Sequence, residues 1–341
     1  MTRVVREPHI AGPVVFTNGL PGCGKTMMSP IVGSLKRVEL MRYNYHLEHT
    51  CVLSYLNLLD VDTASVLIRA QTDLDIYDSM MARETNFRFE DLSSVWKDCR
   101  PLRYFRRLFR PGDAAVIPRI AAERPILHLV THFLLPMSGV LLAALGQRFR
   151  MVEVVRHPLY MIKQWHAWMP RPGTDPRIFF LWIEHKGKSI PWFARGWEDL
   201  YINSSRMDRV IYSIENQWCE GMKVLNSLPP DLREQILLVP FEQFVVKPVP
   251  FMVRLEKLME TTQSRHTPRV MKRQRVPRKM FAEGAALKIY KHYGWEPPGK
   301  GSDEKVELEK RRDFAASEAS PQALAVLDRL SAEYEAAYLN L

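Results

Sequence analysis

The sequence predicts a three-layer α/β/α protein with a central, mostly parallel β-sheet. A glycine-rich stretch, residues 19–26, follows the apolar run 14–16 and precedes a segment that can be helical. Further short apolar runs, at 125–130, 151–155 and 236–239, have the character of buried strands and are separated by patterns with helical spacing. Strands that alternate with helices are typical of a parallel sheet covered on both faces.

The glycine-rich stretch reads GLPGCGKT and matches the pattern G-x-x-x-x-G-K-[ST] in full. Its glycines let the backbone turn tightly and direct N–H groups inward, while Lys25 and Thr26 stand where the helix begins. The alternative is a chance glycine turn, but the position between a strand and a helix favours a loop that binds phosphate or sulfate. ATP and GTP enzymes and sulfotransferases all use such a loop, so the loop alone does not name the anion. The residues expected to contact the anion are Pro21, Gly22, Cys23, Gly24, Lys25, Thr26 and Met27.

The chain has 341 residues, of which 46% are hydrophobic and 25% charged, as in an ordinary soluble globular protein. This length allows about two domains, but one α/β domain with insertions fits equally well. We expect one domain over 1–295, with substrate-side insertions at 60–124 and 169–206. A linker and a helix packed on the domain are expected over 296–341.

The net charge of +10 favours an anionic partner, although the basic residues could equally serve solubility. We find no basic cluster interleaved with aromatic residues that would make nucleic acid the favoured partner. Cys23, Cys51, Cys99 and Cys219 have no regular spacing, which argues against disulfides and structural zinc and favours a cytoplasmic protein. The N-terminus lacks the features of a signal peptide, and no apolar stretch of about 18 residues exists, so no membrane span is expected. The sequence is compatible with a homo-oligomer.

Between the first helix and the second core strand the pattern changes. A strand is expected within 46–59, because residues 50–56 alternate between apolar and polar types. The segment 60–124 is mixed and charged, which indicates either substrate loops and lids or a solvated helical insertion.

Two of the predicted core strands end in polar residues. The run 125–130 leads into Thr131 and His132, and the run 151–155 ends at Arg156. The carboxyl ends of parallel strands form the ligand crevice of an open sheet. Position therefore favours a functional role for His132 and Arg156 over a structural one.

The remainder of the chain supplies packing elements and one candidate pocket. Residues 175–203 are rich in aromatic side chains, which suit either an acceptor pocket or a core. Apolar residues at helical spacing over 207–228 predict a packing helix. Ser320, followed by Pro321, predicts the start of a last helix.

Residues 130–168 resemble the central block of the cytosolic sulfotransferases, in which a T-H-L-P turn is followed by a helix, a strand and an R-x-P segment. The resemblance implies that His132 is the catalytic histidine and that Arg156 binds the 3'-phosphate of the donor. Gln164 stands where the family has a serine and would be the second ligand of that phosphate.

Two later segments extend the resemblance. The sequence around Glu242 and Pro248 is similar to a strand, acid and proline signature found across many sulfotransferases, which gives Glu242 a supporting role behind the loop. The family closes the 3'-phosphate site with a late basic segment. Arg275, Arg278 and Lys279 are the candidates for it here.

The resemblance implies transfer of a sulfuryl group from 3'-phosphoadenosine 5'-phosphosulfate (PAPS), without a metal, to a hydroxyl or amine of a glycan or other small molecule. The loop and Lys25 would hold the 5' phosphosulfate, and His132 would take the proton of the acceptor. Because Met27 replaces the adenine-stacking tryptophan of the family, we expect Trp165 or Trp295 to cover the adenine.

Two alternatives stay open at this point. The loop also fits a kinase that transfers phosphate from ATP, in which Asp60 or Asp62 would have to organise Mg²⁺. Since the strand ends carry His132 and Arg156 rather than acids, a metal-independent donor is favoured. The other alternative is a non-catalytic nucleotide-binding protein of the same fold.

Overall fold

The computed structural model describes residues 3–7, 9–170, 174–284, 291, 296, 298 and 303–339. Its core is a five-stranded sheet in the spatial order β2-β3-β1-β4-β7, and all neighbouring strands run parallel. These strands are β1 (Val14–Asn18), β2 (Arg42–Tyr43), β3 (Leu127–Val130), β4 (Phe149–Val155) and β7 (Ile236–Pro240). A separate antiparallel hairpin consists of β5 (Trp182–His185) and β6 (Lys188–Pro191). The predicted α/β class with a parallel central sheet is confirmed.

β1 occupies the middle of the sheet, and all five of its residues are buried. Its first three residues are apolar and three of the five are β-branched, as expected for a strand covered on both faces. Val14 lies beside Leu127 of β3 on one side and beside Phe149 of β4 on the other. Strands are thus added on both sides of β1, so the direction in which the chain crosses the sheet reverses at β1. A reversal of this kind opens a crevice at the carboxyl ends of the strands.

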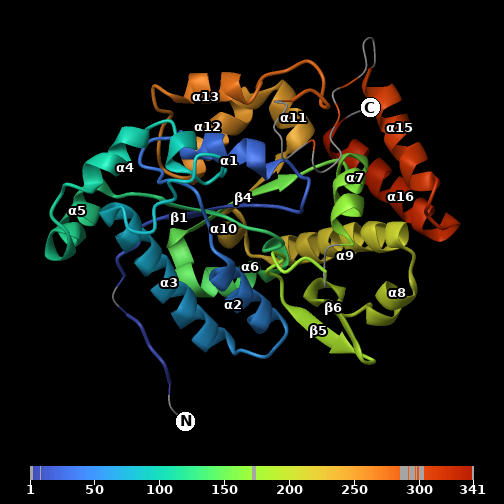
Figure 1. Ribbon diagram of the computed structural model, residues 1–341, viewed down its shortest axis with the longest axis horizontal. Helices are drawn as coiled ribbons and strands as arrows, with labels where there is room; N and C mark the ends of the chain where they lie inside the picture. Colours follow the sequence, from blue (N-terminus) through green and yellow to red (C-terminus); the bar gives the residue numbers. More distant parts are fainter. Residues whose placement is uncertain are drawn as a thin grey trace.

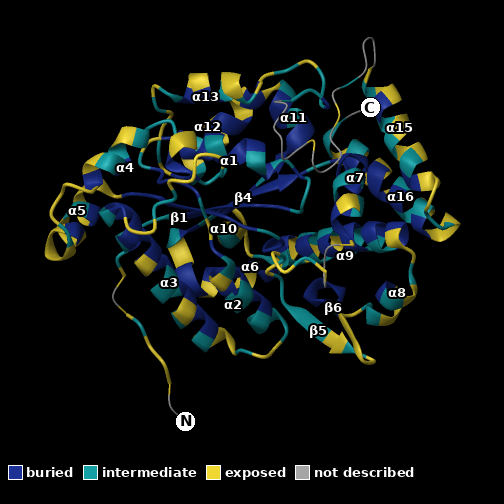
Figure 2. Ribbon diagram, viewed as in Figure 1, coloured by how far each residue is buried: buried dark blue, intermediate teal, exposed yellow. Residues whose placement is uncertain are grey.

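Helices cover both faces of the sheet (Figure 1): α1, α12 and α13 lie on one face, and α2, α3, α6 and α9 on the other. Buried residues form one large apolar core that extends between these layers (Figure 2). The helices are α1 (Lys25–Gly33), α2 (Tyr45–Tyr55), α3 (Val61–Met81), α4 (Pro101–Arg107), α5 (Val116–Glu123), α6 (Ser138–Leu145), α7 (Pro158–Trp168), α8 (Glu198–Asn203), α9 (Arg206–Ser227), α10 (Pro230–Arg233), α11 (Phe241–Val246), α12 (Pro248–Leu258), α13 (Thr267–Arg273), α15 (Glu304–Ala316) and α16 (Pro321–Tyr338). Short 3-10 turns are η1 (Val95–Lys97), η2 (Asp113–Ala115), η3 (Leu135–Met137), η4 (Gly146–Arg148) and η5 (Trp192–Ala194).

The prediction of a strand within 46–59 is wrong, because most of this segment belongs to α2. The helix begins after Asn44, whose side chain accepts a hydrogen bond from the backbone N–H of Leu47 at 2.9 Å. Its buried side chains recur at the spacing of a helix face. The alternation over 50–56 is therefore a coincidence within a short window. The Asn44 cap, which precedes this window, begins the helix instead.

The last two helices pack onto the sheet domain. α15 contacts α7, and α16 contacts both α7 and α9. Ser320 caps α16, as predicted, by accepting a hydrogen bond from the N–H of Ala323 at 3.2 Å. The division of the chain at residue 295 stays a prediction. Of the helices in the described ranges, none combines the length and the apolar character that crossing a bilayer requires.

Candidate active site

A cleft of about 430 Å³ opens where β1, β3, β4 and β7 end. Its walls include the glycine-rich loop after β1, the turn after β3 and the first residues of α7 and α11. This is the edge of the sheet at which the reversal of strand order predicts a ligand. The sequence-predicted site residues that line the cleft are Pro21, Gly22, Gly24, Lys25, Thr26, Met27, His132, Arg156, Gln164 and Arg278.

The glycine-rich loop depends on its glycines for both conformation and space. Gly22 and Gly24 have φ angles of 86° and 103°, in the left-handed region that other residues avoid. A Cβ atom added to Gly24 would lie 2.3 Å from the ring of Phe241. α1 begins at Lys25, at the edge of the cleft. The N–H groups at the start of a helix point towards such an edge and suit an anion bound there.

Lys25 is buried against this loop. Its Nζ donates hydrogen bonds to the carbonyl oxygens of Gly19 at 2.9 Å and Leu20 at 3.3 Å. Burial lowers the pKa of Lys25, while the thiol of Cys23 and the carboxylate of Glu48 act in the opposite direction. The ammonium group is thus held beside the loop, where a bound anion would restore part of its lost solvation.

Asn18, the last residue of β1, fixes the turn that carries His132. Asn18 Oδ1 accepts hydrogen bonds from the Thr131 hydroxyl at 2.9 Å and from the backbone N–H of Leu134 at 3.2 Å. Phe133 adopts a left-handed conformation (φ 61°) and buries its ring in the core. The turn is therefore anchored on both sides of His132, which lines the cleft.

The imidazole of His132 pairs with the buried carboxylate of Glu48 in α2. Glu48 Oε1 accepts a hydrogen bond from the backbone N–H of His132 at 3.0 Å and lies 3.2 Å from Nδ1. A carboxylate in this position favours the tautomer with its proton on Nδ1, which leaves Nε2 able to accept a proton. Burial lowers the pKa of His132, and the charge of Lys25 lowers it further, whereas Glu48 raises it. His132 therefore has the protonation state of a general base at neutral pH.

Arg156 follows β4 and reaches back to the loop. Its Nη1 donates to the carbonyl oxygen of Gly22 at 2.8 Å, and its Nε lies 3.7 Å from the carboxylate of Glu242. The guanidinium group lies over the rings of Phe241 and Tyr160, at 4.3 and 5.0 Å from their centroids. Aromatic faces and a carboxylate thus hold this arginine in one orientation.

Glu242 lies behind Arg156 and is completely buried. It accepts hydrogen bonds from the backbone N–H of His157 at 3.4 Å and from the hydroxyl of Tyr334 at 2.5 Å. The carboxylate therefore links the start of α7 to α16 and orients Arg156. This arrangement agrees with the supporting role expected for Glu242.

Two more arginines lie near Arg156. Arg278 lies over the ring of Phe241 at 5.0 Å, and Arg311 of α15 lies over the ring of Tyr160 at 4.5 Å. We call Arg156, Arg278 and Arg311, which all line the cleft, the arginine corner. Within the described part of the chain, the Nε atoms of Arg156 and Arg311 are buried without a hydrogen-bond partner. Buried, unsatisfied guanidinium donors of this kind suit a bound anion.

The other predicted anion ligands take different places. Gln164 lines the cleft, and its Oε1 would lie 3.2 Å from a Cβ atom added to Gly22. Arg275 and Lys279 are exposed and are not among the described residues that line the cleft. Cys23 is buried and also lies outside that lining.

Trp165 does not cover an adenine, and this expectation is wrong. Its ring is completely buried, packs against Phe133 and Phe193, and donates a hydrogen bond from Nε1 to the carbonyl oxygen of Pro21 at 2.8 Å. The inward face of α7 thus uses this tryptophan to support the loop. Trp295 lies outside the described residues.

The lining around His132 is largely aromatic. Tyr43 stacks on the imidazole at 6.3 Å between ring centroids, and Phe180 meets it edge-on at 6.5 Å. The insertion 169–206 therefore borders the cleft, while 60–124 is mainly helical and contributes Leu92. Besides Met27, Tyr160 and Phe241, the aromatic and large apolar residues of the described lining are Tyr43, Tyr45, Leu92, Trp168, Ile178, Phe179 and Phe180.

Most charged side chains in the described lining are cationic: six are lysine or arginine, against the single acid Glu283. No group of three or more His, Cys, Asp or Glu residues in the described ranges is arranged to hold a metal ion. Asp60, considered for Mg²⁺, instead caps α3 by accepting a hydrogen bond from the N–H of Thr63 at 2.9 Å. Neither Asp60 nor Asp62 is among the described lining residues.

Sequence reasoning missed two residues of this site, Glu48 and Arg311. Glu48 was hidden by the incorrect strand, although the Asn44 cap and helical spacing would have placed it on an inward face. Arg311 is one of several charged residues in α15, and its local sequence carries no signal that separates it from its neighbours.

No model of a known protein family matches the chain, and no curated protein is similar to it in sequence. Among solved structures, the chain is similar to the sulfotransferase domain of the olefin synthase from Synechococcus PCC 7002, with 13% identity, a TM-score of 0.41 and coverage of 98% of each chain. It is also similar to the sulfotransferase STF9 from Mycobacterium avium, with 13% identity, a TM-score of 0.39 and coverage of 91% of this chain and 77% of that chain.

Proposed function

We propose that the protein is a sulfotransferase that moves a sulfuryl group from PAPS to a hydroxyl or amine of a small acceptor. The observation that carries this proposal is the meeting, in one cleft, of an anion loop, a neutral histidine and the arginine corner. The loop suits the 5' phosphosulfate, and the arginine corner suits a second phosphate at a separate position. A donor with two anionic groups uses both features, and the mostly cationic lining needs no metal to balance it.

The residues of the cleft then have distinct roles. Lys25 and the first N–H groups of α1 stabilise the charge that develops on the leaving phosphate oxygen. As the acceptor oxygen bonds to sulfur, the bond between sulfur and that phosphate oxygen breaks, and the acceptor proton passes to Nε2 of His132. Glu48 is a positioning residue that keeps His132 in the required tautomer. Gln164, beside the loop, is a further hydrogen-bond donor for the nucleotide.

The aromatic lining around His132 supports an acceptor with a flat or apolar face. A sugar ring or a phenol can stack on Tyr43 and Phe180 while its hydroxyl group points to the imidazole. The acceptor belongs to one of these two chemical classes under this proposal.

The test is calorimetric binding of 3'-phosphoadenosine 5'-phosphate and of AMP, which lacks the 3'-phosphate, to the wild-type protein and to Arg156→Gln. Because Arg156 also contacts the loop, the useful quantity is the ratio of the two affinities in each protein. We expect the bisphosphate to bind more tightly than AMP without metal. In the variant the ratio of the two affinities should fall about tenfold, which is the effect expected for the loss of one charge-assisted phosphate contact.

Equal affinity of the wild-type protein for the two nucleotides would refute the assignment of the arginine corner. Tighter binding of ATP with Mg²⁺ than of the bisphosphate would refute the sulfotransferase and support the kinase. Binding of neither nucleotide would support a non-catalytic role for the fold.

A further inference from the structure

A second basic site lies far from the candidate active site. A groove of about 540 Å³ is lined by Arg100, Arg103, Arg106, Arg107, Arg110 and Arg265, which we call the arginine groove. Arg100 donates to the carbonyl oxygens of Gly33 and Leu35 at the end of α1. Since α1 begins at the cleft, the groove is at the opposite edge of the sheet. α4 and α5 lie on the left in Figure 1, and α7 and α15 on the right.

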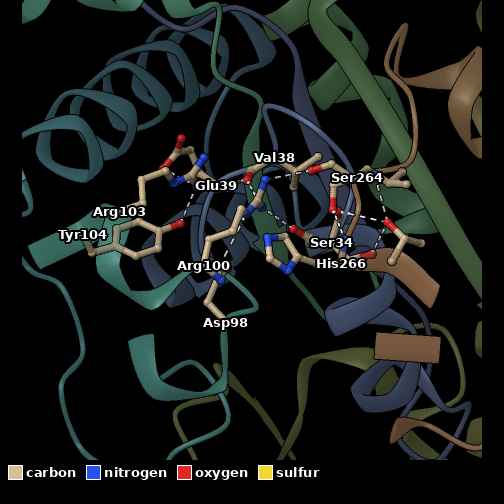
Figure 3. A network of polar contacts seen from close by, with 12 residues as sticks. Ser34, Val38, Glu39, Asp98, Arg100, Arg103, Tyr104, Ser264 and His266 are labelled. Atoms are coloured by element: carbon tan, nitrogen blue, oxygen red, sulfur yellow. Dashed lines mark hydrogen bonds and ion pairs between the residues drawn. The ribbon is translucent and has the colours of Figure 1, made fainter. Parts of the chain in front are cut away.

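The inner arginines of the groove are held rigidly by the fold. Figure 3 shows Arg100 reaching the carbonyl oxygen of Val38, at 2.8 Å, and Arg103 beside the carboxylate of Glu39, at 3.1 Å. Arg107 also pairs with Glu39, at 2.6 Å. Four of the six arginines pair with carboxylates, which are Glu39, Asp98 and Glu123, so the six arginines exceed these acids by three positive charges.

The outer arginines contribute little to the fold. Arg106 is exposed, and within the described ranges no residue forms a hydrogen bond or ion pair with its side chain. Arg265 is exposed and contacts only the ring of His266, at 3.4 Å, among the described residues. Positive charges held at a surface without a structural partner are available to an anionic ligand.

Large exposed apolar side chains lie next to these arginines in the sequence, within α4 and directly after it. Leu102, which lines the groove, is 65% exposed, Leu108 is 50% exposed, and Phe109 is 87% exposed. We call these three residues the apolar rim. The exposed Trp96 packs against α4, since its ring lies 5.2 Å from that of Phe105.

We propose that the arginine groove and the apolar rim together dock the protein onto an anionic phospholipid membrane. Guanidinium groups match lipid phosphates in geometry and charge, and the apolar rim can enter the interface between headgroups and acyl chains. Two of the three rim residues, Leu102 and Leu108, are aliphatic and have no ring to stack on bases. Exposed basic residues beside exposed apolar side chains are typical of peripheral membrane proteins. Docking of this kind needs no spanning helix.

The test is co-sedimentation of the whole protein with vesicles of phosphatidylcholine alone and with vesicles in which phosphatidylserine replaces part of it. We expect binding to the anionic vesicles that weakens with salt. Arg106→Gln combined with Arg265→Gln should reduce it about 25-fold, because each basic residue near an anionic surface is worth roughly a fivefold change. Phe109→Ser should reduce it about tenfold, since a large apolar side chain is then lost from the interface.

Matched controls separate this surface from general charge and hydrophobicity. Lys188→Gln combined with Lys223→Gln removes two exposed cations elsewhere, and Leu58→Ser removes an apolar side chain that is 72% exposed. Both controls should bind anionic vesicles as the wild-type protein does. Equal binding to the two kinds of vesicle, or equal losses in controls and test variants, would overturn the proposal. Binding of a single-stranded oligonucleotide or an acidic peptide, but not of anionic vesicles, would also overturn it and assign the groove to a soluble polyanion.

Discussion

Replacing Glu48 with glutamine tests whether the buried carboxylate prepares His132 for proton transfer. The amide has nearly the same shape and keeps one acceptor oxygen, so it can preserve the 3.0 Å bond from the backbone N–H of His132. It removes the negative charge beside Nδ1, 3.2 Å away, so the remaining amide oxygen is a weaker acceptor for the proton on that atom and stabilises the imidazolium less.

The expected effect has two parts. Loss of the residue that positions a functional histidine typically lowers activity roughly 10- to 100-fold. We therefore expect kcat to fall by about that factor while binding of 3'-phosphoadenosine 5'-phosphate stays unchanged. The second part concerns pH. Glu48 raises the pKa of His132 against the lowering effects of burial and Lys25. Without that charge the pKa falls further, so the acid limb of the kcat profile should move to lower pH.

The assay is kcat against pH for the wild-type protein, Glu48→Gln, His132→Ala and the double variant. Because the two residues act as one unit, the double variant should be no slower than His132→Ala alone. A loss of kcat that is constant with pH, or an acid limb that moves to higher pH, would contradict the positioning role. Additive losses in the double variant would do the same.

Two further predictions concern other charged residues. Arg278→Gln should weaken binding of 3'-phosphoadenosine 5'-phosphate about tenfold in calorimetry, whereas the exposed Arg275→Gln should not, and equal losses would contradict the arginine corner. Burial alone would raise the pKa of Glu39, but the charges of Arg103 and Arg107 outweigh burial and lower the pKa from 4.5 to about 2. This difference corresponds to about 3 kcal/mol of folding free energy at neutral pH. A lowered carboxyl pKa stabilises the fold above the unfolded value and loses that effect as pH falls towards 2. Glu39→Gln should therefore cost about 3 kcal/mol or more in chemical denaturation at neutral pH, and a deficit that does not shrink in acid would refute this reasoning.

The sequence could predict the features that depend on short stretches of chain. The loop that contains Gly22, Gly24 and Lys25 has a pattern that is complete within eight residues. Its backbone conformation requires glycine at the positions with positive φ, so the local sequence is enough to predict it. The ends of β3 and β4 were also predictable, because an apolar run that stops at a polar residue marks both the strand and its carboxyl end. His132 and Arg156 follow directly from this pattern and the parallel order of the sheet.

The arginine corner could not be predicted as a unit. Arg156, Arg278 and Arg311 come from the end of β4, from a loop after α13 and from α15, and the shared contacts with Tyr160 and Phe241 exist only in the folded protein. In the sequence, Arg275 and Arg278 are equivalent members of one basic run. The fold separates them by directing one to the cleft and the other to solvent.

The chemistry of His132 was less predictable than its position, because the position depends on a nearby strand and turn whereas the chemistry depends on a contact that is distant in the sequence. Its position depends on β3 and on the bonds from Asn18 to the turn, all of which belong to the sheet. Its ability to accept a proton depends on Glu48, 84 residues earlier, on a helix whose identity rests on the Asn44 cap. A misread helix boundary was therefore enough to conceal the partner that selects the reactive tautomer. In this fold the strand ends determine which residue types reach the cleft, and the covering helices determine what those residues can do there.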